Sequence, residues 1–265
     1  MVRLDMASPA RLLQPDDGPA ATVENADGRA PILLICDHAR PAVPRALAAL
    51  GLGPSELSRH IAYDIGAAEV ARHLARWFDA PFVASGFSRL VVDCNRRPED
   101  PGSMPPSSDG TEVPANRTIS PAERALRLAE CFQPYHDAIE ACIAAAPAPP
   151  AMVSIHSFTP SLSGFQRPWQ IGILWNEDTR IATPLMAALA AKGVAVGDNQ
   201  PYSARDPHGY TLPAHAESRA LPHVLIEIRQ DLIHEAAGAE SWATLLHDCL
   251  VPILHGLGRH PGRRS

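Results

Sequence analysis

The sequence predicts one α/β domain of three layers, α/β/α, built on a mixed, largely parallel central sheet. Short apolar runs typical of strands buried on both faces alternate along the chain with longer segments of helical periodicity. Such alternation favours a sheet with helices on both faces. The chain has 265 residues, of which 46% are hydrophobic, and this is enough for one sizeable core. Residues 1–29 lack periodicity, so we expect an irregular lead-in followed by a single domain over residues 30–265.

Short apolar runs predict the strands. The first ends at Cys36, immediately before Asp37 and His38. The last precedes Arg229 and carries a glutamate, Glu227, inside an otherwise apolar segment. The expected strands cover residues 31–36, 82–85, 90–93, 152–155, 170–175 and 223–228.

Three segments have the periodicity of helices. At the start of the first, Asp64 is a candidate N-cap. The second begins with a capping box from Ser120 to Glu123, with proline at the first helical position. Further along this helix His136 and Glu140 share one face, and we expect them to form a surface pair. The expected helices cover residues 64–78, 120–143 and 181–191.

Composition and charge exclude several classes of function. The net charge of −6 gives no basic field for nucleic acid or anionic lipid, so neither is expected as a partner. The five cysteines are an odd number without a C-x-x-C pair, which indicates reduced thiols and a cytoplasmic location. No run of about 18 apolar residues and no secretory signal pattern occurs, so no membrane association is expected. The lack of G-x-S-x-G, G-x-G-x-x-G and P-loop motifs disfavours serine hydrolases and nucleotide enzymes.

Histidines and a glutamate lie at the ends of three expected strands. His38 follows the first strand, His156 follows the fourth, and Glu227 lies within the last. In open α/β sheets, ligands bind at the carboxyl ends of the strands. Two imidazoles and a carboxylate match the ligand set of a catalytic zinc, and a glutamate among apolar neighbours is a candidate general base. The alternatives are structural: a buried His38, a strand-end His156, and Glu227 paired with Arg229.

Arginines provide the candidate anion contacts. Asn95 and Arg96 follow the third expected strand and precede a proline-rich segment, residues 97–119, which predicts a long loop. A guanidinium at this position offers a planar fork for a carboxylate. Arg89 is a candidate for binding an anion or stabilising an oxyanion, and a salt bridge to Asp93 is its alternative.

Six short motifs lie along the chain in the order Asp37-His38-Ala39, Tyr63-Asp64, Ser88 to Arg96, Ser154-Ile155-His156-Ser157, Asn199-Gln200-Pro201-Tyr202 and Ile226 to Asp231. In residues and order they resemble the N-formylglutamate amidohydrolase family, over about residues 31–235. The resemblance implies a fold similar to that of zinc carboxypeptidases and aspartoacylase-like deacylases, with a mixed sheet between helices. It implies hydrolysis of a small anionic N-acyl amino acid, such as N-formylglutamate, to formate and the free amino acid.

The same resemblance implies a bound Zn²⁺, or another divalent metal, and roles for individual residues. His38 and His156 would be metal ligands, and Glu227 would be the general base. The implied substrate contacts are Asn95 and Arg96 for the carboxylate, with Arg229 and Arg89 as further anion contacts.

The expected third metal ligand differs from the one in carboxypeptidase-like sites. Pro41 stands three residues after His38, where carboxypeptidase-like sites usually place a glutamate. Asp64 is therefore the candidate third ligand, and a helix N-cap is its alternative role. Two other functions stay open, a metal-free binding or regulatory protein on the same fold and a metallopeptidase acting on short peptides.

Overall fold

A central sheet organises the chain, and the computed structural model describes residues 11–206 and 209–260. The strands of this sheet are β1 (Ala21–Glu24), β2 (Ile32–Cys36), β3 (Phe82–Ser85), β6 (Ala151–Phe158), β9 (Ile171–Leu174), β10 (Val196–Asp198) and β11 (His223–Arg229). Within the described ranges they form a seven-stranded sheet in the order β1-β3-β2-β6-β11-β9-β10. Neighbours from β3 through β11 are parallel, β1 and β9 are antiparallel to β3 and β11, and β10 is parallel to β9. The predicted mixed, largely parallel sheet is confirmed.

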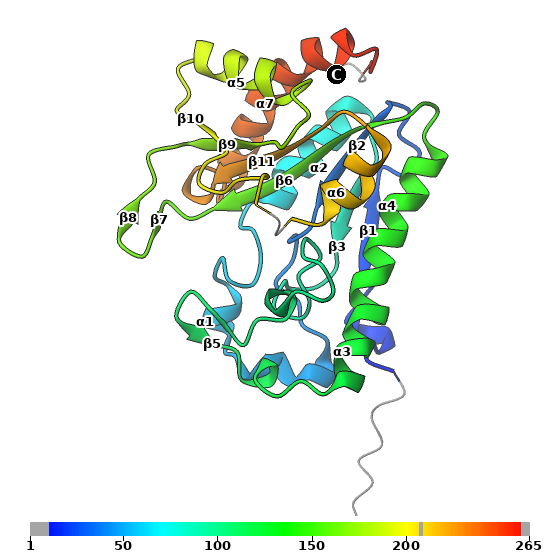
Figure 1. Ribbon diagram of the computed structural model, residues 1–265, viewed down its shortest axis with the longest axis vertical. Coiled ribbons are helices and arrows are strands. Elements are labelled where there is room, and N and C mark those ends of the chain that lie inside the picture. Colours follow the sequence, from blue (N-terminus) through cyan, green and yellow to red (C-terminus); the bar gives the residue numbers. More distant parts are fainter. Residues whose placement is uncertain (1–10, 207–208, 261–265) are drawn as a thin grey trace, which may run out of the picture.

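Helices cover both faces of the sheet (Figure 1). The first face packs against α2 (Ala67–Phe78), α5 (Ala182–Ala191) and α7 (Ala236–Gly256). The opposite face packs against α4 (Gln133–Ala145) and α6 (Thr211–His215). A helix α3 (Pro121–Arg127) continues through a π-helical turn, Leu128–Phe132, into α4. The successive side chains of β2 are all buried because they alternate between these two apolar layers.

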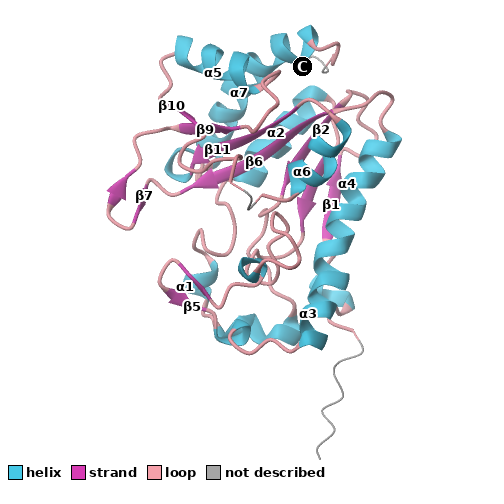
Figure 2. Cartoon of the chain, viewed as in Figure 1, coloured by secondary structure: helices cyan, strands magenta, loops and turns pink. Residues whose placement is uncertain are grey.

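Beyond the carboxyl ends of the parallel strands, the chain is mostly loop (Figure 2). This part has an apolar cluster of its own, the loop cluster, which includes Leu50, Ile61, Leu90 and Val113. Its short helices and strands are α1 (Pro54–Leu57), β4 (Ser107–Ser108) and β5 (Thr111–Glu112), and a second hairpin, β7 (Ser161–Leu162) and β8 (Phe165–Gln166), extends from the end of β6. The 3-10 turns are Pro15–Asp17, Arg45–Gly51, Pro101–Ser103, Pro114–Asn116, Glu217–Arg219 and Gln230–Leu232. Among the described helices, none is long and apolar enough to cross a membrane.

Three details of the sequence prediction are wrong. Residues 90–93 form a buried turn instead of a strand, with the Asp93 amide donating to the Ser103 carbonyl at 2.7 Å. These apolar residues are buried by the loop cluster and not by the sheet. The expected irregular segment 1–29 contains β1 at the sheet edge, while residues 1–10 lie outside the described ranges. The N-cap of α2 is Gly66 and not Asp64, so the alternative role of Asp64 is excluded.

Candidate active site

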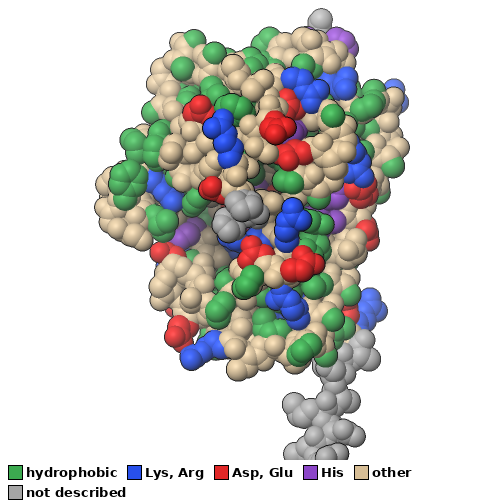
Figure 3. Space-filling model, viewed as in Figure 1, with side chains coloured by type: hydrophobic (Ala, Val, Ile, Leu, Met, Phe, Trp, Pro, Cys, Tyr) green, Lys and Arg blue, Asp and Glu red, His purple; other side chains and the backbone are tan. Residues whose placement is uncertain are grey.

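A cavity of about 680 Å³ opens at the carboxyl ends of the central strands, between the sheet and the loop-rich part. Side chains from β6, β11 and the turns after β2 and β3 line it, and they include His38, Asp64, His156 and Glu227. Figure 3 shows basic and acidic side chains close together around a hollow in the middle of this face. The predicted position of a ligand site, at the strand ends, therefore coincides with a real cavity.

His38, Asp64 and His156 meet at one point of this cavity. The Nδ1 atoms of His38 and His156 lie 3.3 Å and 2.8 Å from the same oxygen, Oδ2 of Asp64. One ligand atom from each residue lies within 4.8 Å of the others, and all three side chains are buried. His156 lies inside β6, which extends to Phe158, and so is held by the sheet ladder. The structure thus brings together the three residues expected to bind metal.

Two further aspartates hold the far side of the histidine rings. Nε2 of His38 lies 2.7 Å from Oδ1 of Asp93, and Nε2 of His156 lies 2.9 Å from Oδ2 of Asp37. An acceptor carboxylate beside Nε2 orients each ring so that its Nδ1 atom points toward Asp64, and loss of the Nδ1 proton would free that nitrogen to bind a metal. Metal-binding histidines are usually oriented in this way. The donor set and its outer carboxylates fit a divalent metal.

The charges in this cluster shift one another's pKa values. Burial raises the pKa of Asp37, but the hydrogen bond and charge of His156 outweigh it and hold the pKa at about 2. Burial likewise opposes ionisation of Asp64 and Asp93, yet His38 and the nearby cations lower the pKa of both carboxyls. All three aspartates are therefore carboxylates at neutral pH, as metal ligands and their partners must be.

Glu227 faces the same centre from the neighbouring strand. It is paired in register with His156 along the parallel strands β11 and β6. The side chain is 7% exposed, and within the described residues its Oε2 atom has no hydrogen-bond partner. Burial raises the pKa of Glu227 to about 7, although the charge of His156 opposes this shift. A carboxyl group with these properties is suited to proton transfer.

The arginines do not all reach the cavity. Arg89 and Arg96 line it, whereas Arg229 does not, and its guanidinium binds Asp231 with an Nε–Oδ1 distance of 2.8 Å. The alternative role of Glu227, a pairing with Arg229, is absent from the described contacts. The interpretation of Arg229 as a substrate contact gains no support from its position.

Arg89 forms the salt bridge to Asp93 that was its alternative role, and it also lines the cavity. Its Nη2 atom donates to Oδ2 of Asp93 at 2.7 Å, and Nη1 lies 3.5 Å from Oδ1 of Asp64. Arg96 is less tightly held, with Nη1 at 3.2 Å from Oδ2 of Asp100. The guanidinium of Arg96 is therefore more readily available than that of Arg89 to bind a substrate anion.

Asn95 combines a structural contact with a position at the cavity. Its Oδ1 atom accepts hydrogen bonds from the amides of Tyr210 and Thr211, both at 3.0 Å. Its side-chain NH₂ group remains as a donor, because the oxygen carries both of these bonds. The start of α6 is in this way tied to the turn that carries Asn95 and Arg96.

The expected surface pair of His136 and Glu140 is wrong. His136 is 4% exposed, with Nδ1 at 2.8 Å from Nε2 of His215 and Nε2 at 3.0 Å from the carbonyl of Cys94. Glu140 accepts instead from Nδ1 of His215. The helix face that carries both residues is covered by α6, which the sequence pattern of α4 does not reveal.

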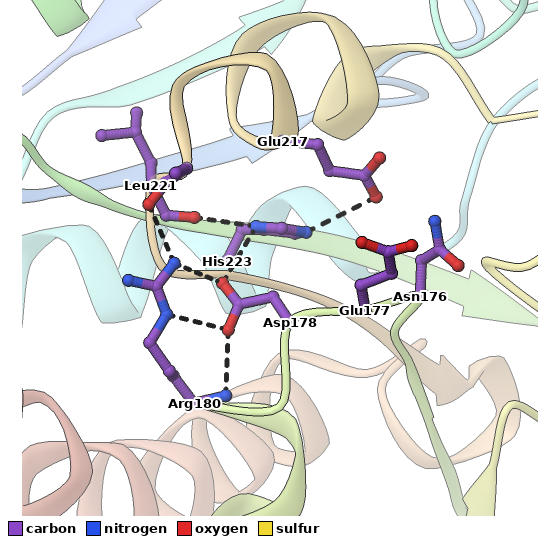
Figure 4. A pocket seen from close by; sticks show the side chains of 8 residues that line it. Asn176, Glu177, Asp178, Arg180, Glu217, Leu221 and His223 are labelled. Atoms are coloured by element: carbon purple, nitrogen blue, oxygen red, sulfur yellow. Dashed lines mark hydrogen bonds and ion pairs between the residues drawn. The ribbon is translucent and has the colours of Figure 1, made fainter.

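One end of the cavity adjoins a smaller pocket of about 310 Å³ (Figure 4). Glu217 and His223 line both spaces. The Nδ1 atom of His223 lies 2.9 Å from the carbonyl of Leu221, and Asp178 binds Arg180 through an Oδ2–Nη2 contact of 2.7 Å. His223, Asp178 and Arg180 at this end therefore already have polar partners.

Sequence reasoning missed the outer carboxylates and one cavity residue. Asp37 and Asp93 stand next to predicted site residues, so a search for acceptors behind each histidine would have found them. Tyr202 also lines the cavity. It belongs to the Asn199 to Tyr202 motif, to which no role was assigned.

Comparisons with known proteins identify the fold and the family of the chain. A gene product from Agrobacterium tumefaciens has a solved structure that is 38% identical, with a TM-score of 0.90 over 94% of this chain and 100% of that one. The structure of an N-formylglutamate amidohydrolase from Ralstonia eutropha is 19% identical, with a TM-score of 0.67 over 91% of this chain and 99% of that one. The second likeness shows the fold alone. No curated protein gives a significant match. The family model for N-formylglutamate amidohydrolase matches residues 30–234, and the chain therefore belongs to this family and is an amidohydrolase.

Proposed function

We propose that the chain is a metal-dependent hydrolase of N-formyl amino acids, with N-formylglutamate as the first candidate substrate and formate and the free amino acid as products. The observation that carries the proposal is the convergence of His38, Asp64 and His156, with ligand atoms within 4.8 Å of one another, beside the unpaired Oε2 of Glu227. Family membership supports hydrolysis of an N-acyl amino acid. The described residues that line the cavity supply a base and cations for that reaction.

The metal would be Zn²⁺ or another divalent ion, held by His38, Asp64 and His156. Two imidazoles and one carboxylate are a usual set of protein ligands for catalytic zinc. When bound, the ion supplies Lewis acidity, which polarises an acyl carbonyl and activates water. Asp37 and Asp93 keep the two rings oriented toward it.

Glu227 is the proposed proton carrier. Its desolvated carboxylate takes a proton from the attacking water and returns it to the nitrogen of the departing amine. A carboxyl pKa of about 7 allows both transfers near neutral pH, because the acid and base forms are then both populated.

Arg96 is the proposed partner of the substrate carboxylate, because its planar fork can donate hydrogen bonds to both carboxylate oxygens. Asn95 adds a side-chain N–H donor beside it. Arg89 contributes positive charge to the same wall of the cavity. Together these groups would hold the acyl carbon near the metal centre, and such fixed orientation lowers the barrier to attack.

Elemental analysis and product release test the proposal together. Protein purified without chelator should contain stoichiometric divalent metal, lose it in His156→Ala, and release formate from N-formylglutamate. A panel of formyl-, acetyl- and succinyl-amino acids and of dipeptides identifies the acyl group. Metal-free protein that binds acidic amino acids tightly would instead indicate a binding protein, and preferential cleavage of dipeptides would indicate a peptidase.

A further inference from the structure

Arg167 is a buried cation that the proposed reaction does not use. The residue is 6% exposed. Its Nη1 atom donates to the carbonyl oxygen and Oγ1 of Thr159 at 3.2 Å and 3.0 Å, and its Nη2 atom donates to Oη of Tyr202 at 3.1 Å. Burying a guanidinium costs free energy unless its contacts compensate. Much of that compensation comes from Tyr202.

Arg167 holds the ring of Tyr202 as well as its hydroxyl. The Cζ atom of Arg167 lies 5.0 Å from the centroid of the Tyr202 ring and 5.6 Å from that of Phe158, within the range of cation–π attraction. The end of β6, the β7–β8 hairpin and the loop that carries Tyr202 therefore meet at one guanidinium. Contacts to both the ring and the hydroxyl fix the orientation of the phenol.

Tyr202 lies at the mouth of the cavity. Its side chain lines the same space as Glu227 and Arg89, and the residue is 45% exposed. A guanidinium has only donors, so the phenol oxygen must accept in the contact with Arg167 and keeps its own proton. Within the described residues, the Tyr202 hydroxyl makes no other hydrogen bond. Its O–H group is therefore a free donor in the cavity that also holds the proposed base.

The electrostatics keep this donor protonated and strengthen it. Burial and the negative charge of Glu227 raise the pKa of Tyr202, against the opposing effect of Arg167 and Arg89. The phenol is therefore neutral at physiological pH. The hydrogen bond from Arg167 polarises the phenol oxygen, which makes the O–H group a stronger donor to the next acceptor.

We propose that the Tyr202 hydroxyl donates a hydrogen bond to the acyl oxygen of the substrate as negative charge develops there, and that Arg167 is the positioning residue for this donor. The inference rests on the proposed function, because it needs an acyl group beside Glu227. A neutral donor that reaches the developing charge would stabilise the transition state more than the bound substrate.

The variant Tyr202→Phe removes the hydroxyl and keeps the ring on Arg167. We expect kcat to fall about 10- to 100-fold, while KM changes less than about threefold, as for a donor that acts in the transition state. The matched control is Tyr63→Phe, whose side chain packs in the loop cluster outside the cavity lining and should leave kcat unchanged. An unchanged kcat in Tyr202→Phe, or a rise in KM alone, overturns the proposal.

Arg167→Lys tests the positioning role. Lysine keeps the positive charge but lacks the fork that reaches Thr159 and Tyr202 together, so kcat should fall about tenfold with little change in KM. In Arg167→Lys/Tyr202→Phe, kcat should be no lower than in Tyr202→Phe alone, because both changes remove one interaction. Additive losses would show that Arg167 acts independently of the hydroxyl and overturn this part.

The wild-type enzyme separates this inference from the proposed function. The variants are compared on whichever N-acyl amino acid the wild-type protein hydrolyses fastest. If the wild-type protein hydrolyses none, the proposed function fails and the inference with it. If it hydrolyses one and Tyr202→Phe is equally fast, only the inference fails. Circular dichroism and melting temperature confirm that each variant is folded.

Discussion

The Oδ1 atom of Asp93 lies 2.7 Å from Nε2 of His38, on the side of the ring that faces away from Asp64. The other oxygen of Asp93 binds Arg89 at 2.7 Å. One carboxylate therefore orients a candidate metal ligand and anchors a cation of the cavity wall. The apparent salt bridge between Arg89 and Asp93 is part of the site and not an alternative to it.

Asp93→Asn should weaken metal binding about 10- to 100-fold, the usual effect of losing a carboxylate behind a ligand histidine. Competition with a chromophoric chelator measures the affinity. Asp16→Asn, at an exposed carboxylate that pairs with Arg45, is the control and should bind metal as the wild type does. Wild-type affinity in a folded Asp93→Asn protein would contradict this assignment.

Glu227→Gln should keep its metal and lose turnover by about 10²-fold or more, because an amide of the same shape cannot accept and return the proton. Formate release and metal content are measured on the same preparation. Glu217→Gln removes a negative charge from the other end of the cavity and should change kcat by less than about threefold. Equal turnover in Glu227→Gln and wild type would remove Glu227 from the reaction.

Arg96→Met should raise KM about 10- to 100-fold, since a charge-assisted hydrogen bond contributes about 1.5–3 kcal/mol. The comparison variant is Arg229→Met, which loses a guanidinium bound to Asp231 outside the cavity lining. Steady-state kinetics with one N-acyl amino acid compares the two variants. A larger rise in KM for Arg229→Met than for Arg96→Met would reverse the assignment made from position.

His136 should contribute less to the stability of the domain as pH decreases from about 6.5 toward 4, whereas the raised pKa of Glu227 acts in the opposite direction. Burial, followed by the charge of His215, lowers the pKa of His136 from 6.5 to about 4. In this window the unfolded chain binds a proton that the folded chain excludes, so the free energy of unfolding rises with pH. The loss at the acid end is on the order of 3 kcal/mol.

Urea denaturation at several pH values measures this contribution of His136. In His136→Gln the free energy of unfolding should rise less between pH 4 and 6.5 than in the wild type, and His234→Gln, at an exposed position, should keep the wild-type slope. A slope that is the same in His136→Gln as in the wild type would assign the acid sensitivity to other groups.

The sequence predicts the central strands because their burial is nearly complete. Apolar runs mark β2, β6, β9 and β11, and β2, β6 and β11 have side chains in the apolar layers on both faces of the sheet. The edge strand β1 is missed because it is only partly buried and has no apolar run. Residues 90–93 are equally apolar, but a short buried run does not distinguish a strand from a packed turn.

The residues of the candidate site were likewise predictable only where a local sequence pattern fixes their position. His38, His156 and Glu227 could be placed because each belongs to an apolar strand whose end lies at the ligand edge. Alternation by two along β11 puts Glu227 and Arg229 on one face, yet Arg229 is the last residue of the strand and binds Asp231 in the turn that follows. His136 was misplaced because the helix that covers it, α6, lies far along the chain.

His156 and Glu227 come from the adjacent strands β6 and β11, and His38 from the turn after their neighbour β2. No local stretch of the chain can assemble these groups, unlike a motif that presents two ligands on a single helix. An ion held by His38, Asp64 and His156 would thus bind only after the middle of the sheet has formed, and its binding energy would add to the stability of the whole domain. Metal binding would therefore require a completed sheet. Molecules with mispaired strands would not bind the ion and would remain open to proteolysis.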